Sequence, residues 1–278
     1  MRNHLLLAAG AVTLTAAPAF AQDRSDETYS GVYVAVSGGY DIQSNDIGSR
    51  LIFDRNGDGR FNDAVTGANG DAFAPGFCNG RAQGATRLPG GCERDRNRGS
   101  IYGRIGVDRQ MGNFVVGALG EFGTTGIKDY TSGFTTTPAS YVFERGVTWE
   151  ASGRLRAGYT VNNGLFYATG GLGYARLRHR FTTTNTANTF TTALDDRDRF
   201  GFIVGGGVEY KITRNISIGA EYTYHDYKDS QYLVRVTQGS APATNAFVFP
   251  PNTAGTTIAR SDPDFRWHSL RAVVGFRF

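Results

Sequence analysis

Charged side chains recur at alternate positions in segments that are otherwise apolar or rich in glycine. Alternation of this kind places one set of side chains on a single face of a β-strand. Pairs of carboxylates can perform general acid–base chemistry, but both signs occur here in equal number. Since an unpaired buried charge is strongly unfavourable, we expect a network of ion pairs, with a narrow path for ions as the alternative. The set comprises Arg104, Glu121, Glu150, Arg154, Arg156, Glu209, Glu221 and Arg271.

Histidine and serine are the other residues that could act as catalysts. His225 lies on an alternating segment, apparently on its charged face, and His268 is followed directly by Ser269. A Ser–His–acid site is defined by geometry rather than by adjacency, and no lipid-deacylase motif surrounds these residues. We therefore expect both histidines to be structural and predict no enzyme activity.

One segment has the spacing of a calcium-binding loop. Asp-x-Asn-x-Asp-Gly matches the first half of an EF-hand loop, in which oxygen atoms at alternate positions surround one hard cation. The twelfth position is Val65 instead of glutamate, so a polar turn closed by Asx side chains is the alternative. The ligands would be Asp54, Asn56, Asp58, the carbonyl of Arg60, and Asn62.

The elements that position these residues are short strands with period-two alternation. In the last strand the apolar residues are Leu270, Ala272, Val274, Phe276 and Phe278, separated by Arg271, Val273, Gly275 and Arg277. An apolar face opposite a face with arginine is typical of a strand between lipid and a polar lumen. Eight segments alternate in this way: 31–42, 100–109, 114–123, 148–160, 165–177, 200–212, 216–227 and the strand from about 265.

Short and long connections alternate strictly between these segments. The connections near 110–113, 161–164 and 213–215 are tight-turn sequences. The long connections are 43–99, 124–147, 178–199 and 228–264, and the threonine-rich third and fourth are expected to form flexible, solvated surface. This pattern predicts an all-β, eight-stranded antiparallel transmembrane barrel with short periplasmic turns and long extracellular loops.

The N-terminal residues predict export. Residues 1–21 combine Arg2, an apolar stretch and the small-x-small site Ala19-Phe20-Ala21, which is the pattern of a cleaved secretory signal. The barrel domain would then span 22–278. Two cysteines in an exported chain, Cys78 and Cys92, predict one disulfide in the first long loop.

Composition excludes two classes of protein. Mean hydropathy is −0.32 and no long apolar run follows the signal, which excludes a helical membrane protein. The formal net charge of +4 is mild and dispersed, so no nucleic-acid partner is expected.

The chain resembles the small eight-stranded outer-membrane barrels of the OmpA and OmpX type, and most of all the porin-like opacity proteins of alphaproteobacteria. The resemblance rests on RLRAGY at 154–159, YATGGLGY at 167–174, GGGVEY at 205–210, AEY at 220–222 and the final phenylalanine. It implies location in the outer membrane of a Gram-negative bacterium. It also implies that the barrel-assembly machinery reads Phe276 and Phe278 as an assembly signal.

The expected partners are therefore outer-membrane lipid, lipopolysaccharide and the assembly machinery, and no cofactor is expected besides calcium. Arg178-His179-Arg180 forms a basic loop edge, with His179 expected to face lipopolysaccharide phosphates. We expect a structural or surface-interaction protein with a plugged polar lumen, because an eight-stranded barrel is only wide enough for side chains to fill. A small-solute channel is the second hypothesis, and a lipid-modifying enzyme is the third.

Overall fold

The computed structural model describes residues 29–43, 48–89, 91–192, 196–229, 232–251 and 253–278. The predicted signal at 1–21 lies outside these residues. No helix in the described part of the chain is long and apolar enough to cross a membrane.

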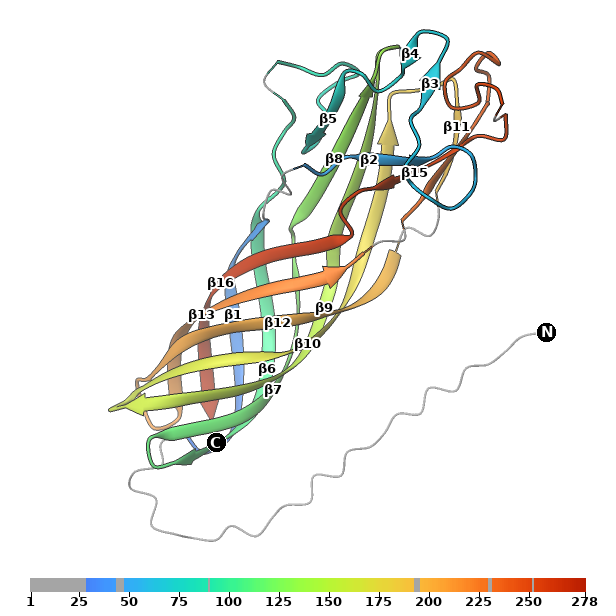
Figure 1. Ribbon diagram of the computed structural model, residues 1–278. Helices are drawn as coiled ribbons and strands as arrows, with labels where there is room; N and C mark the ends of the chain where they lie inside the picture. Colours follow the sequence, from blue (N-terminus) through green and yellow to red (C-terminus); the bar gives the residue numbers. More distant parts are fainter. Residues whose placement is uncertain (1–28, 44–47, 90, 193–195, 230–231, 252) are drawn as a thin grey trace, which may run out of the picture.

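Eight long strands close into one antiparallel barrel (Figure 1). Each of these strands pairs with the next, and the last, β16, pairs with the first, β1, so the barrel is closed. The predicted fold class is confirmed. In order around the barrel the strands are β1 (Gly31–Gln43), β6 (Arg98–Met111), β7 (Phe114–Thr125), β9 (Ala139–Val161), β10 (Gly164–Thr183), β12 (Asp196–Lys211), β13 (Ile216–Lys228) and β16 (Asp264–Arg277).

The outward face of the barrel is apolar. Leu155 and Val274, for example, are 70% and 56% exposed, whereas their neighbours on the same strands alternate into the interior. Strand alternation therefore sorts the side chains as the sequence predicts, with apolar groups outside and polar groups inside.

Aromatic rings lie outside at both ends of the apolar face. At the end that carries the long loops, Phe122, Trp149, Tyr174 and Phe200 form a row of contacts across four strands. At the other end, Phe114 contacts Tyr159 and Phe276 contacts Phe278. Rings at these levels are typical of membrane–water interfaces. Phe276 and Phe278 are exposed there, and their reading by the assembly machinery stays a prediction.

Tight hairpins close the end opposite the long loops. The turn between β9 and β10 has Asn162 at φ 53°, and the turn between β6 and β7 has Gly112 at φ 61°. Both values are in the left-handed region that glycine and asparagine tolerate. The short connections are thus confirmed, and Phe278 lies at this end (Figure 1).

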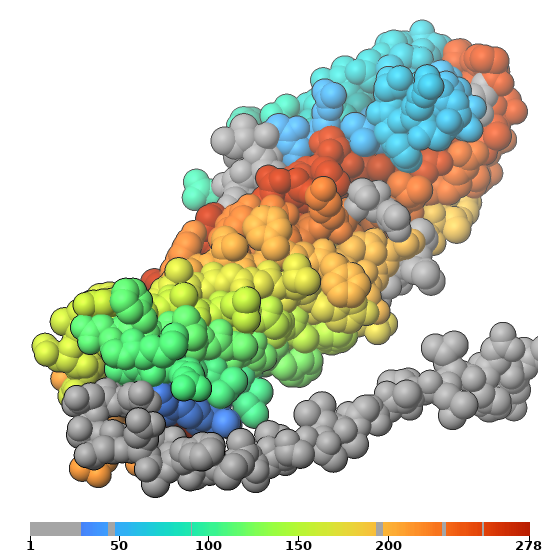
Figure 2. Space-filling model, turned by 60° about the horizontal axis from the view of Figure 1, so that its bottom comes forward, coloured from blue at the N-terminus to red at the C-terminus, as the bar shows by residue number. Residues whose placement is uncertain are grey.

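The long connections fold into a second body beyond the barrel (Figures 1 and 2), including the third and fourth, which were expected to be flexible surface. β9 begins nine residues earlier than the predicted 148, and β10 extends to Thr183. Three different connections contribute to one four-stranded sheet, in the order β11-β14-β15-β2. The added strands are β2 (Leu51–Asp54), β3 (Thr66–Gly67), β4 (Gly70–Asp71), β5 (Gly76–Asn79), β8 (Lys128–Thr135), β11 (Thr189–Thr192), β14 (Val234–Thr237) and β15 (Thr256–Arg260).

A hydrophobic core explains why these loops are ordered. Phe53, Phe73, Tyr141, Val236 and Ile258 come from three of the long connections and are all nearly inaccessible to solvent. Burying each large apolar side chain contributes roughly 1.5–3 kcal/mol, which offsets the entropy of ordering long loops. The predicted disulfide is also present, and joins Cys78 on β5 to Cys92 with Cα atoms 6.2 Å apart.

Candidate functional site

A cluster of five charges fills the middle of the barrel. Glu121 and Glu221 are bridged by Arg104, whose Nη2 lies 2.6 Å from Glu121 Oε2 and 2.5 Å from Glu221 Oε1. Arg154 bridges the same two oxygen atoms at 3.1 Å each, and Arg271 lies 2.8 Å from Glu121 Oε1. All five side chains are at most 2% exposed. They come from strands β6, β7, β9, β13 and β16, so the network ties non-adjacent parts of the wall together.

A second cluster lies toward the end with the tight hairpins. Arg156 donates from Nε to Asp108 Oδ1 at 2.8 Å and from Nη1 to Glu209 Oε2 at 2.9 Å. Arg277 reaches the other Asp108 oxygen at 2.7 Å and lies over the ring of Tyr33. Asp108 and Arg277 were absent from the predicted network. Both lie within predicted strands, and alternation places both on the polar face, so the signal that could have identified them was present in the sequence.

Glu150 departs from the arginine pairing expected for it. Its Oε1 accepts a hydrogen bond from Tyr227 at 2.5 Å and lies 2.8 Å from His225 Nδ1, while Oε2 accepts one from Tyr102 at 2.9 Å. The other ring nitrogen of His225 lies 3.2 Å from Arg271 Nη2. His225 is thus a buried link between the carboxylate and the central charges, as its predicted structural role requires.

An apolar layer follows directly above Glu150. Trp267 stacks on His225 at 4.6 Å and on Tyr227 at 5.3 Å between ring centroids. Its neighbours in the same cluster include Leu177 and Phe265, both with no exposed surface. The full cluster is Ile127, Val147, Ala175, Leu177, Tyr227, Phe265 and Trp267. This buried cluster contacts His225 through Trp267 on one side and Arg145 through Phe265 on the other.

A third charged cluster lies above this apolar layer. Arg145 Nε lies 2.5 Å from Asp129 Oδ2, and Arg260 Nη2 lies 2.7 Å from the same oxygen atom. Burial raises the pKa of Asp129, but the guanidinium groups of Arg260 and Arg145 outweigh it and hold the pKa below its usual value. Nearby, burial and then the Asp129 charge raise the pKa of Asp95 to about 7.

The position of His179 shows that one prediction was wrong, namely that this side chain faces lipopolysaccharide phosphates. It is 4% exposed and points inward, where its Nε2 lies 2.6 Å from Asp229 Oδ2 and its ring stacks on Tyr232. It therefore does not face lipid. Its neighbours Arg178 and Arg180 have the opposite orientation and are exposed, because side chains alternate along β10.

His268 and Ser269 do not form a catalytic pair. His268 Nδ1 lies 2.6 Å from the hydroxyl of Tyr222 on the outer face. Ser269 is buried in the interior, where it contacts Asp41 and accepts a hydrogen bond from Arg271 Nε at 2.8 Å. Successive residues of a strand point to opposite faces, so adjacency in sequence separates these two groups.

The candidate calcium loop forms a chain of Asx turns. Asp54 accepts hydrogen bonds from the backbone N–H groups of Gly57 at 2.7 Å and Gly59 at 3.1 Å. Asn56 and Asp58 accept from residues two positions ahead. Within the described residues no group of three His, Cys, Asp or Glu side chains is arranged to hold a metal. The turn is thus present, whereas calcium binding by Asp54, Asn56, Asp58, Arg60 and Asn62 stays a prediction.

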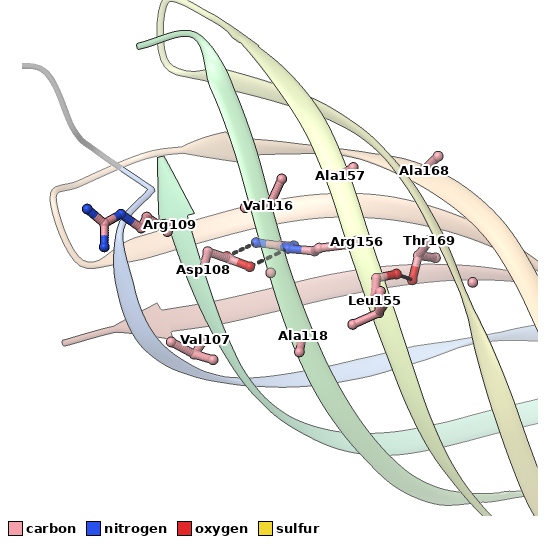
Figure 3. Close-up of a pocket in the computed structure, with 12 residues that line it drawn as sticks. Val107, Asp108, Arg109, Val116, Ala118, Leu155, Arg156, Ala157, Ala168 and Thr169 are labelled. Carbon is pink, nitrogen blue, oxygen red and sulfur yellow. Dashed lines mark hydrogen bonds and ion pairs between the residues drawn. The ribbon is translucent and has the colours of Figure 1, made fainter. Parts of the chain in front are cut away.

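A groove of about 720 Å³ lies on the outer wall, not among the interior charges (Figure 3). It arises where outward side chains are small, as at Ala118, Ala157 and Ala168, between larger neighbours such as Leu155. The Asp108–Arg156 pair is drawn beside these apolar groups in Figure 3. Because the groove is apolar and lies on the outward face of the barrel, we expect lipid chains to cover it. We assign no reaction to it.

Comparison with known proteins is consistent with this geometry. The family model described as "Outer membrane protein beta-barrel domain" matches residues 6–278. A 22 kDa outer membrane protein of Rhizobium leguminosarum is 31% identical over 140 residues, which are 50% of this chain and 58% of that protein. A 31 kDa outer-membrane immunogenic protein of Brucella melitensis is 36% identical over 84 residues, 30% of this chain and 35% of that protein.

The matches thus span about a third to three-fifths of these relatives' lengths. Among solved structures, the outer membrane protein OprG from Pseudomonas aeruginosa aligns with a TM-score of 0.49 at 10% identity. That alignment covers 91% of this chain and 99% of OprG.

Proposed function

Because the chain belongs to the outer membrane protein beta-barrel family and is an outer-membrane protein of Gram-negative type, we propose that it is a non-conducting structural and surface-interaction protein. The barrel anchors the chain, and the folded body outside it meets partners at the cell surface. Its lumen is closed by side chains instead of forming a path for solutes.

The apolar layer around Trp267 is the observation that carries this proposal. A conducting path would have to pass the aromatic stack of His225, Trp267 and Tyr227, whose members are fully buried. Below it, three arginines and two glutamates are paired at hydrogen-bond distance. Ions crossing this region would have to compete with arginine–carboxylate pairs that are already formed.

The carboxylates of the predicted interior set are all held by other side chains. Each carboxylate of the predicted set is engaged: Glu121, Glu209 and Glu221 by arginine, and Glu150 by histidine and two tyrosines. A general base must be within reach of a substrate proton, and these oxygens are enclosed. We therefore propose that the protein has no enzymatic role.

The folded outer body is the part suited to partners. Its sheet β11-β14-β15-β2 unites distant loops on one hydrophobic core, so it presents a preorganised surface. Preorganised surfaces bind with a smaller entropy cost than flexible loops.

Conductance in planar lipid bilayers tests the closed lumen. The refolded protein should insert without stepwise currents under conditions in which a general porin, as positive control, gives them. Reproducible current steps from the wild-type protein, altered by Arg104→Gln or Glu221→Gln, would instead establish the channel hypothesis.

A further inference from the structure

A basic pocket lies on the outer wall of the barrel, separate from the interior and from the groove of Figure 3. It measures about 190 Å³ and lies where β8, β9 and β10 run side by side. Its lining includes Lys128, Glu144, Arg178 and Arg180, together with Gly146. Three of these five residues are cations and one is an anion.

Strand register explains how the pocket forms. Gly146 pairs with Lys128 on one side and with Arg178 on the other. The two cationic residues are therefore two strand spacings apart, about 10 Å, and no side chain rises from the glycine between them. Arg180 pairs with Glu144 one row farther out.

The charged side chains that line this pocket differ in whether they form an ion pair. Lys128 pairs with Glu144, and these side chains are 30% and 17% exposed. Arg178 and Arg180 are exposed and have no ion-pair partner among the described residues. The residues opposite them in register are Glu144 for Arg180 and Asp196 for Arg178. Because neither arginine is held in an ion pair among the described residues, their guanidinium groups suit the bidentate recognition of phosphate.

The depth of the pocket identifies the kind of anion. Directly below lies the aromatic row, with Trp149 paired to Arg176 and in contact with Tyr174. Arg178 follows Tyr174 by four residues, about 13 Å of tilted strand. Aromatic belts mark the interface of the membrane, so the pocket lies at the level of lipid headgroups.

We propose that this pocket binds a phosphate group of the phosphorylated glycolipid in the outer leaflet. Arg178 and Arg180 donate to the phosphate oxygens, and Lys128 adds positive charge when its pairing with Glu144 loosens. This inference goes beyond the proposed function, because it holds whether or not the lumen conducts.

Binding of purified lipid A to the refolded, full-length barrel in detergent tests the proposal, with native mass spectrometry as the readout. The wild type should prefer bisphosphorylated over dephosphorylated lipid A. Arg178→Gln with Arg180→Gln should weaken that preference by about tenfold or more, since one charge-assisted hydrogen bond is worth roughly a decade of affinity. Glu144→Gln should strengthen binding severalfold, because it removes the one carboxylate among the residues that line the pocket.

A matched control removes the same number of positive charges at the end of the barrel that carries the tight hairpins. Arg109→Gln with Arg214→Gln removes two exposed arginines near the tight hairpins and should leave the preference intact. An equal loss in this control, or equal affinity of the wild type for both lipids, would overturn the proposal. Inorganic phosphate that displaces the lipid at comparable concentration would refute the lipid and leave a free-phosphate site.

Discussion

Replacing Glu121 by glutamine should be among the most damaging conservative changes in the chain. The Glu121 carboxylate accepts hydrogen bonds from three arginines: two from Arg104 at 2.9 and 2.6 Å, one from Arg154 at 3.1 Å and one from Arg271 at 2.8 Å. Loss of its charge leaves Glu221 alone against three buried guanidinium groups. Removing one member of a buried ion network costs about 3–5 kcal/mol.

A surface pair gives the matched comparison. Glu93 is 3.9 Å from Arg96, and both side chains are more than a third exposed, so Glu93→Gln should change the free energy of unfolding by about 0–1 kcal/mol. The assay is urea unfolding of barrels refolded into lipid vesicles, followed by tryptophan fluorescence. Equal free energies of unfolding for Glu121→Gln and wild type would refute the argument that these charges are desolvated and interdependent.

The arginines of the central cluster should differ in the same assay. Arg104 makes three hydrogen bonds to the two glutamates, whereas Arg154 makes two longer ones, and its Nε and Nη1 have no hydrogen-bond partner among the described residues. Arg154→Met should therefore destabilise less than Arg104→Met, and it should partly rescue Glu121→Gln because it restores the charge balance. The reverse order would contradict the assigned contacts.

Three further outcomes are expected. Leu155→Arg on the lipid-facing wall should destabilise the barrel by about 2–4 kcal/mol near the membrane midplane, measured by the same unfolding assay. Calcium should bind weakly, in the millimolar range typical of extracellular sites, with heat in calorimetry that Asp54→Ala with Asp58→Ala abolishes; no heat in the wild type would leave only a polar turn. The raised pKa of Asp95, about 7, means that the folded state holds a proton that the unfolded state has released, so stability should fall as pH rises from 4 to 7. Asp95→Asn should flatten that dependence, and an unchanged profile would exclude Asp95 as its source.

Much of the barrel follows from the sequence because its strands obey period two. Phe166 and Leu172 lie an even number of positions apart on one strand and are both exposed on the outer wall, as period two requires, and Arg104 and Glu121 meet inside. These outcomes depend only on which face a residue occupies, and alternation fixes that face locally.

The irregular part of the wall could not be predicted in this way. The register between β9 and β10 shifts between Arg176 and Leu177, so Trp149 points outward while Val147 and Arg145 are buried. A strand continued with strict alternation from Trp149 would put Arg145 in the lipid. Beyond a β-bulge, the residues that would have pointed outward point inward. The local composition gives no signal from which the bulge could be predicted.

The folded body formed by the long loops could not be predicted, because it depends on contacts between residues that are far apart in the sequence. Ile258 pairs with Phe53 from another loop and with Val234 from its own, in strands of only four or five residues. Such short segments show little periodicity. Their order comes from the shared core, which becomes evident only when the loops are placed together. The histidine partner of Glu150 was missed for a related reason, since residues about 75 positions apart meet across the lumen.

The proposed closed lumen requires side chains to fill the barrel from wall to wall, and ordered solvent in a high-resolution crystal structure would show whether they do. Water positions inside the barrel would be mapped from the Asp108 cluster, past Glu150 and Trp267, to the Asp129 cluster. We expect isolated waters at most, with none crossing the apolar layer around Trp267. A continuous column of water through that layer would refute the closed lumen.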